Sequence, residues 1–249
     1  MRIVVTEDYA ALSRAAADLV ADTVARTPDA AVIVATGETP MGLYRELAER
    51  RAQGILDASR LRVFQLDSYL GLGPDDDRSL YRWMRESFLD PLGIPAARVT
   101  RLPGDAADPE AACRAYDRAV AEAGGIDLAI LGLGPNGHLG FNEPPVEAGA
   151  PTRMVTLTDE SIESNARYWG GHDRVPRQAL TAGMAVLLAA RQTLLVASGA
   201  RKRTILRRAV DGPITPDVPA SYLQRAPNVT VIADQAARES DAPADVAAG

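Results

Sequence analysis

A glycine-rich segment near the middle of the chain contains three side chains suited to proton transfer. Asn136, His138 and Glu143 all fall within residues 132–144, and His138 is one of only 2 histidines in the sequence. An imidazole with a carboxylate close by can pass protons, because histidine changes its charge near neutral pH. We predict catalytic roles for these three residues, with a purely structural histidine as the alternative.

The same segment contains the spacing G-x-G-x-x-G, which is typical of dinucleotide-binding loops. That fingerprint requires the third glycine to open a helix packed on the preceding strand. Here the third glycine, Gly137, is followed by His-Leu-Gly and then by Phe-Asn-Glu-Pro-Pro, a sequence that breaks helices. We therefore expect no dinucleotide cofactor.

A second candidate for proton transfer is Asp67, which directly follows an apolar strand predicted over residues 61–66. A carboxylate beside a buried environment can act as a general base with an adjusted pKa. A helix cap or an ordinary loop acid is the alternative interpretation.

Another loop, formed by Thr36, Gly37, Glu38 and Thr39, connects a buried strand to a helix. Glycine and hydroxyl groups at the start of a helix present N–H and O–H donors to an anion. The sequence therefore suggests a phosphate site here, with an ordinary capped turn as the alternative. Glu38 fits a phosphate site only if its side chain points away from the anion.

The chain has 27 basic residues, and only Lys202 among them is lysine. It lies where another predicted strand runs into a helix. A lysine is a compact point charge that is not equivalent to arginine in a tight phosphate site. We predict that Lys202 and Arg167 bind the phosphate, with two ordinary surface cations as the alternative.

These loops need a scaffold that brings them together. Short apolar runs alternate with helical patterns, which predicts an α/β, Rossmann-like, mostly parallel sheet with helices on both faces. In such a sheet the strand-to-helix loops all emerge at one edge. Strands are predicted over residues 2–6, 30–35, 61–66, 99–102, 126–132, 154–157, 193–197 and 229–233. Helices are predicted over residues 9–26, 41–52, 79–89, 109–123, 159–168, 181–190 and 200–210, with Thr158 as the N-cap of the helix that begins at residue 159.

Composition narrows the function further. With 27 basic and 33 acidic residues the net charge is −6, which argues against nucleic-acid binding, and the single cysteine excludes a disulfide framework or a cysteine-based metal site within one chain. No apolar run is long enough for a membrane helix. We expect one cytoplasmic domain spanning residues 1–249, with a flexible tail from about residue 235 and a small molecule as its partner.

The sequence resembles the glucosamine-6-phosphate deaminases over nearly its whole length. The likeness rests on several segments whose order and spacing also agree. They are TGETPMG (residues 36–42), LDSY (66–69), GHLGFNEP (137–144), TRMVTLT (152–158) and PASYLQ (219–224).

This resemblance implies hydrolysis of glucosamine 6-phosphate to fructose 6-phosphate and ammonia, without metal or organic cofactor. It implies that His138 opens the sugar ring, with Glu143 orienting its imidazole and Asn136 completing the proton relay, and that Asp67 moves a proton from C2 to C1. The phosphate would lie on the 36–39 loop, Arg167 and Lys202. Relatives range from monomers to hexamers, so a monomer and a homo-oligomer both stay open.

Three alternatives remain at this stage. Ser68 and Glu38 alter the pocket rim, which leaves room for a related amino-sugar phosphate isomerase or deaminase with another substrate. A 6-phosphogluconolactonase shares the fold and a Gly-His pair, but it would require a different continuation after His138. A sugar-phosphate-sensing regulator would have no need for a base at Asp67.

Overall fold

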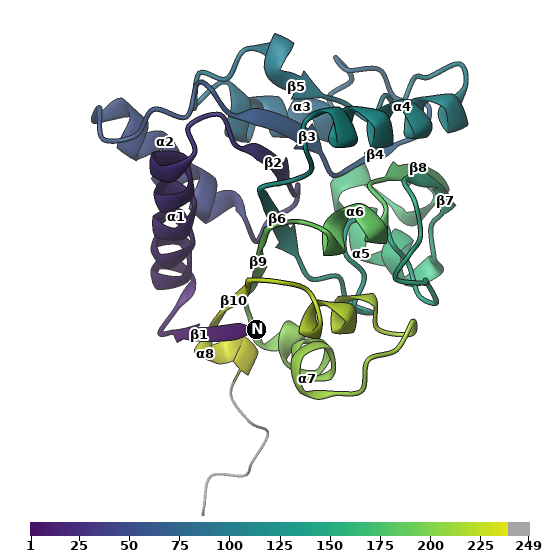
Figure 1. Ribbon diagram of the computed structural model, residues 1–249. Coiled ribbons are helices and arrows are strands. Elements are labelled where there is room, and N and C mark those ends of the chain that lie inside the picture. The colour runs from purple at the N-terminus through teal and green to yellow at the C-terminus, as the bar shows by residue number, and fades with distance from the viewer. Residues whose placement is uncertain (239–249) are drawn as a thin grey trace, which may run out of the picture.

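The computed structural model describes residues 1–238, in which a seven-stranded sheet forms the centre (Figure 1). The strands lie in the order β1-β10-β9-β6-β2-β3-β5, and every neighbouring pair is parallel. They are β1 (Arg2–Thr6), β2 (Ala31–Val34), β3 (Arg62–Gln65), β5 (Val99–Thr100), β6 (Leu128–Gly132), β9 (Gln192–Ala197) and β10 (Val229–Asp234). The predicted mostly parallel sheet is confirmed.

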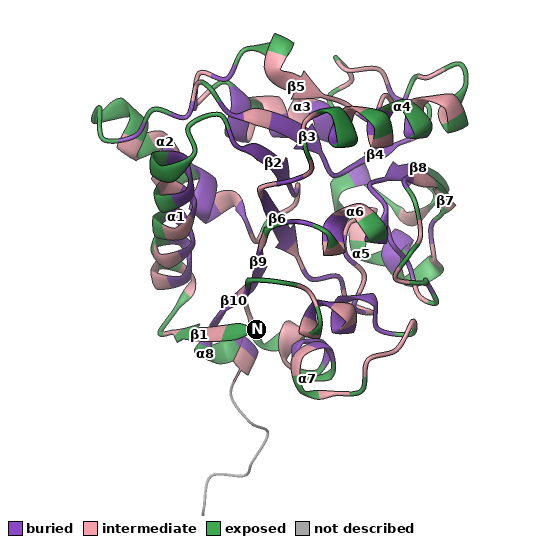
Figure 2. Cartoon of the chain, viewed as in Figure 1, coloured by how far each residue is buried: buried purple, intermediate pink, exposed green. Residues whose placement is uncertain are grey.

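Helices cover both faces of this sheet. Alternate residues of each strand point to opposite faces, so each central strand packs against helices on both sides. Val32 and Val63 pack with α1 (Tyr9–Arg26), α2 (Met41–Ala52) and α3 (Leu80–Met84). On the other face, Ile33 and Phe64 pack with α4 (Pro109–Glu122), α6 (Met184–Leu188) and α7 (Arg203–Asp211). The central strands are accordingly buried on both sides (Figure 2).

A second, smaller sheet was not predicted. It is antiparallel, with the order β4-β8-β7, and consists of β4 (Asp67–Tyr69), β8 (Gln178–Thr181) and β7 (Arg153–Thr156). The prediction of a loop at residues 67–69 was therefore wrong, as was the start of the helix predicted over residues 181–190. Only Ala182 and Gly183 separate β8 from α6, and residues 179–184 are all buried. Periodicity alone cannot separate a short buried strand from a buried helix.

Other differences lie at the ends of elements. The helix predicted over residues 79–89 changes after α3 into a π-helical turn, Arg85–Leu89, and the one over residues 200–210 begins as a 3-10 turn, Ala200–Lys202. α5 (Asp159–Trp169) begins after Thr158, whose side chain caps it as predicted.

The predicted flexible tail is wrong for its first residues. Residues Gln235–Arg238 form α8, in which Ala237 is buried and donates its N–H to Asp234. The rest of that tail, residues 239–249, lies outside the described residues, and the single-domain organisation stays a prediction. Within residues 1–238, none of the helices is long and apolar enough to cross a membrane.

Candidate active site

The loops that follow β2, β3, β6 and β9 line one cavity of about 1000 Å³. All four leave the carboxyl ends of parallel strands, which is where such sheets bind ligands. The cavity lining includes Asp67, His138, Arg167, Lys202 and the 36–39 loop, so the structure brings these predicted residues together. α3 and α5 supply the opposite wall.

Asn136, His138 and Glu143 form a hydrogen-bonded cluster at one side of the cavity. Glu143 Oε2 lies 3.2 Å from His138 Nδ1 and accepts a hydrogen bond of 2.9 Å from Asn136 Nδ2. Only His138 of the three lines the cavity. Asn136 and Glu143 therefore lie behind the imidazole and can act on a ligand only through it.

The charge of Glu143 determines which imidazole nitrogen of His138 carries a hydrogen. Burial acts to raise the pKa of Glu143, but its hydrogen bonds and the charge of His138 outweigh burial and lower the pKa to about 2. An ionised carboxylate only accepts hydrogen bonds, so Nδ1 of His138 must carry a hydrogen. Nε2 is then the nitrogen left to exchange a proton in the cavity.

Two features hold this segment in place. A Cβ at Gly134 would lie 2.1–2.5 Å from the His138 ring, so only glycine lets the backbone approach the imidazole so closely. Farther along, the buried Asn142 donates to the carbonyl oxygens of Leu139 and Ala182, and Phe141 N donates to Thr181 Oγ1. The segment is thus anchored to β8.

The same strand positions Asp67. Asp67 pairs with Thr181 in the register of β4 and β8, and its backbone oxygen accepts a hydrogen bond of 2.8 Å from Gln65 Nε2. Only 6% of Asp67 is exposed, and its carboxylate accepts a hydrogen bond of 3.4 Å from Thr36 Oγ1. Burial raises the pKa of Asp67 to about 7, although the bond from Thr36 opposes this. A carboxyl with this pKa can both accept and return a proton at neutral pH.

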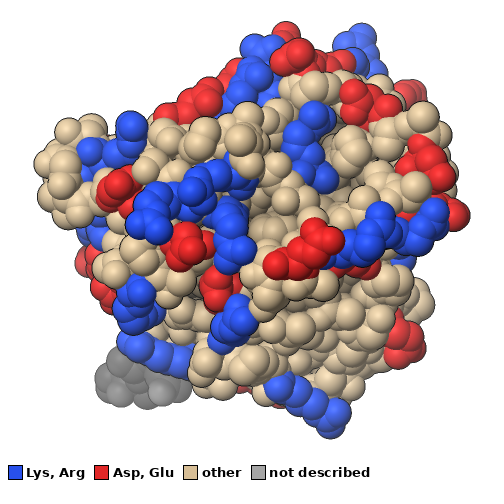
Figure 3. All heavy atoms as spheres, turned by 45° about the horizontal axis from the view of Figure 1, so that its top comes forward, with Lys and Arg blue, Asp and Glu red and all other residues tan. Residues whose placement is uncertain are grey.

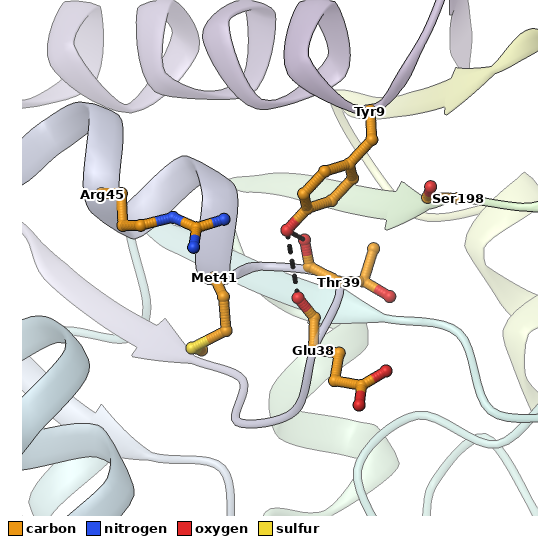
Figure 4. Close-up of a pocket in the computed structure, with 6 residues that line it drawn as sticks. All are labelled: Tyr9, Glu38, Thr39, Met41, Arg45 and Ser198. Atoms are coloured by element: carbon orange, nitrogen blue, oxygen red, sulfur yellow. Dashed lines mark hydrogen bonds between the residues drawn. The ribbon is translucent and has the colours of Figure 1, made fainter.

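The 36–39 loop is shaped by its backbone and by α1. Gly37 has φ of +114°, a conformation that favours glycine. The Tyr9 hydroxyl lies 3.1 Å from the carbonyl oxygen of Glu38 and 3.0 Å from that of Thr39, and donates to them (Figure 4). Because C=O and N–H point in opposite directions across a trans peptide, the Thr39 N–H is directed away from Tyr9.

A smaller pocket of about 370 Å³ lies against the same loop (Figure 4). It is lined by Tyr9, Glu38, Thr39, Met41, Arg45 and Ser198. Glu38, Thr39 and Ser198 also line the larger cavity, so the two hollows share the wall formed by the loop.

Three cations gather at the loop side of the large cavity. Lys202, Arg201 and Arg167 all line it, and burial, followed by the charges of Arg201 and Arg167, lowers the pKa of Lys202. Glu38 Oε2 accepts a hydrogen bond of 2.8 Å from Arg167 Nη2. Like charges held this close favour a bound anion. On the face shown in Figure 3, acidic and basic residues are otherwise interspersed.

The sequence analysis missed several residues of the site. Ser161 Oγ lies 3.3 Å from His138 Nδ1, and Thr158, expected only as a helix cap, donates 3.1 Å from its Oγ1 to Glu143 Oε2. Asp234 accepts hydrogen bonds from Ser198 Oγ and Gly199 N, which fixes the turn before Lys202. One signal in the sequence did point to the contact between α5 and Glu143: Thr158 has the residue type and position of a helix N-cap, and the helix follows the segment that contains His138 and Glu143.

The described residues contain no cluster of potential metal ligands. Across residues 1–238, no group of three or more His, Cys, Asp or Glu side chains is placed to hold a metal ion. The one cysteine, Cys113, is buried in the core.

A parallel sheet with a polar cavity at its carboxyl edge, containing a histidine–carboxylate pair and clustered cations, defines an α/β enzyme for a small anionic ligand. The model of the glucosamine-6-phosphate isomerase/6-phosphogluconolactonase family matches residues 6–232. The chain belongs to this family.

Its relatives cover almost the whole chain. A glucosamine-6-phosphate deaminase from Halothermothrix orenii is 44% identical over 237 residues, which are 95% of this chain and 98% of the relative. One from Cutibacterium acnes is 42% identical, over 95% and 91%. A solved monomeric glucosamine-6-phosphate deaminase superposes with a TM-score of 0.93 at 38% identity, over 95% and 98%. A 6-phosphogluconolactonase from Trypanosoma cruzi, at 19% identity and a TM-score of 0.76, shares the fold.

Proposed function

We propose that this enzyme hydrolyses glucosamine 6-phosphate to fructose 6-phosphate and ammonia. The observation that carries the proposal is the single cavity that contains Asp67, His138 and the cation cluster. Relatives named for this activity at up to 44% identity over nearly the whole chain support it. The reaction uses no metal or organic cofactor, and the sugar phosphate is the partner.

The first step is the opening of the pyranose ring by His138. Its Nε2 accepts the proton of the anomeric hydroxyl and returns a proton to the ring oxygen, so that the C1–O5 bond breaks and C1 becomes an aldehyde. Glu143 keeps the hydrogen on Nδ1. Asn136 donates to Glu143 and holds its carboxylate in place.

The second step is the transfer of a proton by Asp67. Its carboxylate removes the proton from C2 while O1 takes a proton from the 2-ammonium group, so an enolamine forms. The same carboxyl group then delivers its proton to C1. Water then adds to the resulting C2 imine, and ammonia leaves as the C2 ketone forms. A pKa of about 7 suits a group that must be ionised at the start and protonated midway.

The phosphate fixes where the reacting carbons lie. The 36–39 loop, Arg167 and Lys202 line the part of the cavity where cations gather. We propose that these residues bind the phosphate, and that Arg167 gives up its hydrogen bond to Glu38 when it binds the phosphate. Holding one end of the substrate in this way orients C1 and C2 toward the two bases.

The experiment that tests this function measures ammonia release from glucosamine 6-phosphate by the purified protein. We expect one fructose 6-phosphate for each ammonia. Galactosamine 6-phosphate and 6-phosphogluconolactone serve as parallel substrates. Faster turnover of galactosamine 6-phosphate than of glucosamine 6-phosphate would indicate a different amino-sugar substrate. Hydrolysis of the lactone without ammonia release from either amino sugar would indicate that the enzyme is a lactonase.

A further inference from the structure

The first turn of α5 contacts the histidine–carboxylate pair from the side opposite the cavity. Ser161 is completely buried, and its Oγ lies 3.3 Å from His138 Nδ1. One turn earlier, Thr158 Oγ1 donates a hydrogen bond to Glu143 Oε2 and accepts one from Ser161 N. The ring-opening step described above assigns no role to Ser161.

We propose that Ser161 is a positioning residue that holds the His138 imidazole against Glu143 and thereby links the proton-transfer pair to the helix that carries Arg167. The inference rests on the proposed function for its effect on turnover.

The placement of two oxygen atoms explains how Ser161 acts. Glu143 Oε2 lies 3.2 Å and Ser161 Oγ 3.3 Å from the same nitrogen, Nδ1. Two partners restrict the rotation of the ring more than one does, so Nε2 keeps its direction into the cavity. The Ser161 hydroxyl also contributes to the lowered pKa of the Glu143 carboxyl. A buried polar group that loses its partner is costly, so removal of this hydroxyl disturbs both members of the pair.

Ser161 is itself held by the next turn of α5. Its carbonyl oxygen accepts hydrogen bonds of 2.8 Å from Asn165 Nδ2 and 3.1 Å from Ser164 Oγ. Both of these residues line the cavity. At the end of the helix, Arg167 reaches the 36–39 loop through Glu38. One helix therefore contacts His138 at its start and the proposed phosphate site at its end.

Steady-state kinetics with glucosamine 6-phosphate provide the first test. Ser161→Ala should lower kcat about 5- to 20-fold while KM stays within about twofold, because the ring loses its orientation and the phosphate site is untouched. Ser161→Thr keeps the hydroxyl and should recover most of the lost kcat. The matched control is Ser13→Ala, since Ser13 is also a buried helical serine but bonds to the backbone oxygen of Tyr9, away from His138. A kcat for Ser161→Ala within twofold of the parent would overturn the proposal.

Nitrogen NMR of the histidine rings provides a readout independent of turnover. The chain has 2 histidines, so a His172→Gln variant assigns the His138 signals. The parent and the Ser13→Ala variant should show an Nδ1–H proton protected from exchange with water, and Ser161→Ala should show it broadened. An unchanged signal in Ser161→Ala overturns the proposal, with melting curves confirming that each variant is folded. If the parent releases no ammonia, the proposed function fails, and this NMR comparison alone decides the role of Ser161.

Discussion

The two ends of the cavity are built differently. At the proton-transfer end, formed by Asp67, His138 and Glu143, the side chains are almost fully buried: 6% of Asp67 and 13% and 7% of the His138 and Glu143 side chains are exposed. At the anion end, formed by the 36–39 loop, Arg167 and Lys202, the side chains of the Arg167–Glu38 pair are 50% and 57% exposed.

This contrast has an electrostatic consequence. Burial raises the pKa of Asp67 to about 7, well above the usual range of an aspartate, because little water is present to stabilise the charge. Around the exposed pair, water and salt screen the charges. Substitutions at the buried end should therefore act on kcat by large factors, and those at the anion end should act on KM by small ones.

The largest effect is expected for Asp67→Asn, which removes the proton acceptor and keeps the shape. We expect kcat to fall about 10²- to 10⁴-fold, with KM within a few-fold, in an ammonia-release assay. Nearly unchanged turnover would exclude Asp67 as the base and break the contrast between the two ends.

The same variant should reveal the cost of the buried charge. A raised pKa means that the folded state binds the proton more tightly than the unfolded state, so Asp67 lowers the free energy of unfolding as the pH rises from about 4 to about 7. The Asp67→Asn variant has no carboxyl group at this position and does not lose stability in this way. The Tm of the variant minus that of the parent should therefore increase as the pH rises from about 4 to about 7. Thermal melts at pH 4.5, 6 and 7.5 measure it, and an advantage independent of pH would contradict a raised pKa.

An intermediate effect is expected for Glu143→Gln. The amide can turn its NH₂ group toward His138, so Nδ1 no longer has an obligatory acceptor, and we expect kcat to fall about 10- to 100-fold, the loss typical of residues that orient a ligating or catalytic histidine. Substrate titrations separate kcat from KM. A rise in KM without loss of kcat would show that Glu143 contributes to substrate binding, as the residues of the anion end do, and would contradict its role in proton transfer.

At the anion end, Lys202→Arg keeps the charge but replaces a compact ammonium with a broad planar group. We expect KM to rise about 5- to 10-fold and kcat to change less than threefold. If neither constant moves, Lys202 is an ordinary surface cation.

The smallest effect is expected for Glu38→Gln, which removes a carboxylate that competes with phosphate for Arg167. KM should fall about twofold at low ionic strength, and the difference should disappear at high salt, because both groups are half exposed. An increase in KM would show that Glu38 assists binding.

Local sequence was sufficient for much of the fold. β1 and α2 have the predicted bounds, Arg2–Thr6 and Met41–Ala52, because their patterns of apolar residues are regular and end at clear turns. The second sheet was missed because its strands have three or four residues each, and because β4 pairs with β8 across more than a hundred positions of sequence, as Asp67 does with Thr181.

For the candidate site, residue type and spacing identified the loops but not their neighbours. Asn136, His138 and Glu143 lie close in sequence, so their contact could be predicted, and so could their place at the carboxyl edge of the sheet. The contact of Ser161 with His138 depends on how α5 packs, which no local pattern encodes.

By itself, then, the sequence determined the order of the strands and helices of the main sheet, the loops that bear the polar groups, and the class of ligand those groups suit, since each depends on residues near one another in the chain. Only the tertiary structure decided that Asp67 is buried, that Glu143 is ionised behind the imidazole of His138, and that Arg167 meets Glu38. Burial depends on packing by residues distant in sequence, and Arg167 and Glu38 are 129 positions apart, so folding alone brings that pair within hydrogen-bonding range.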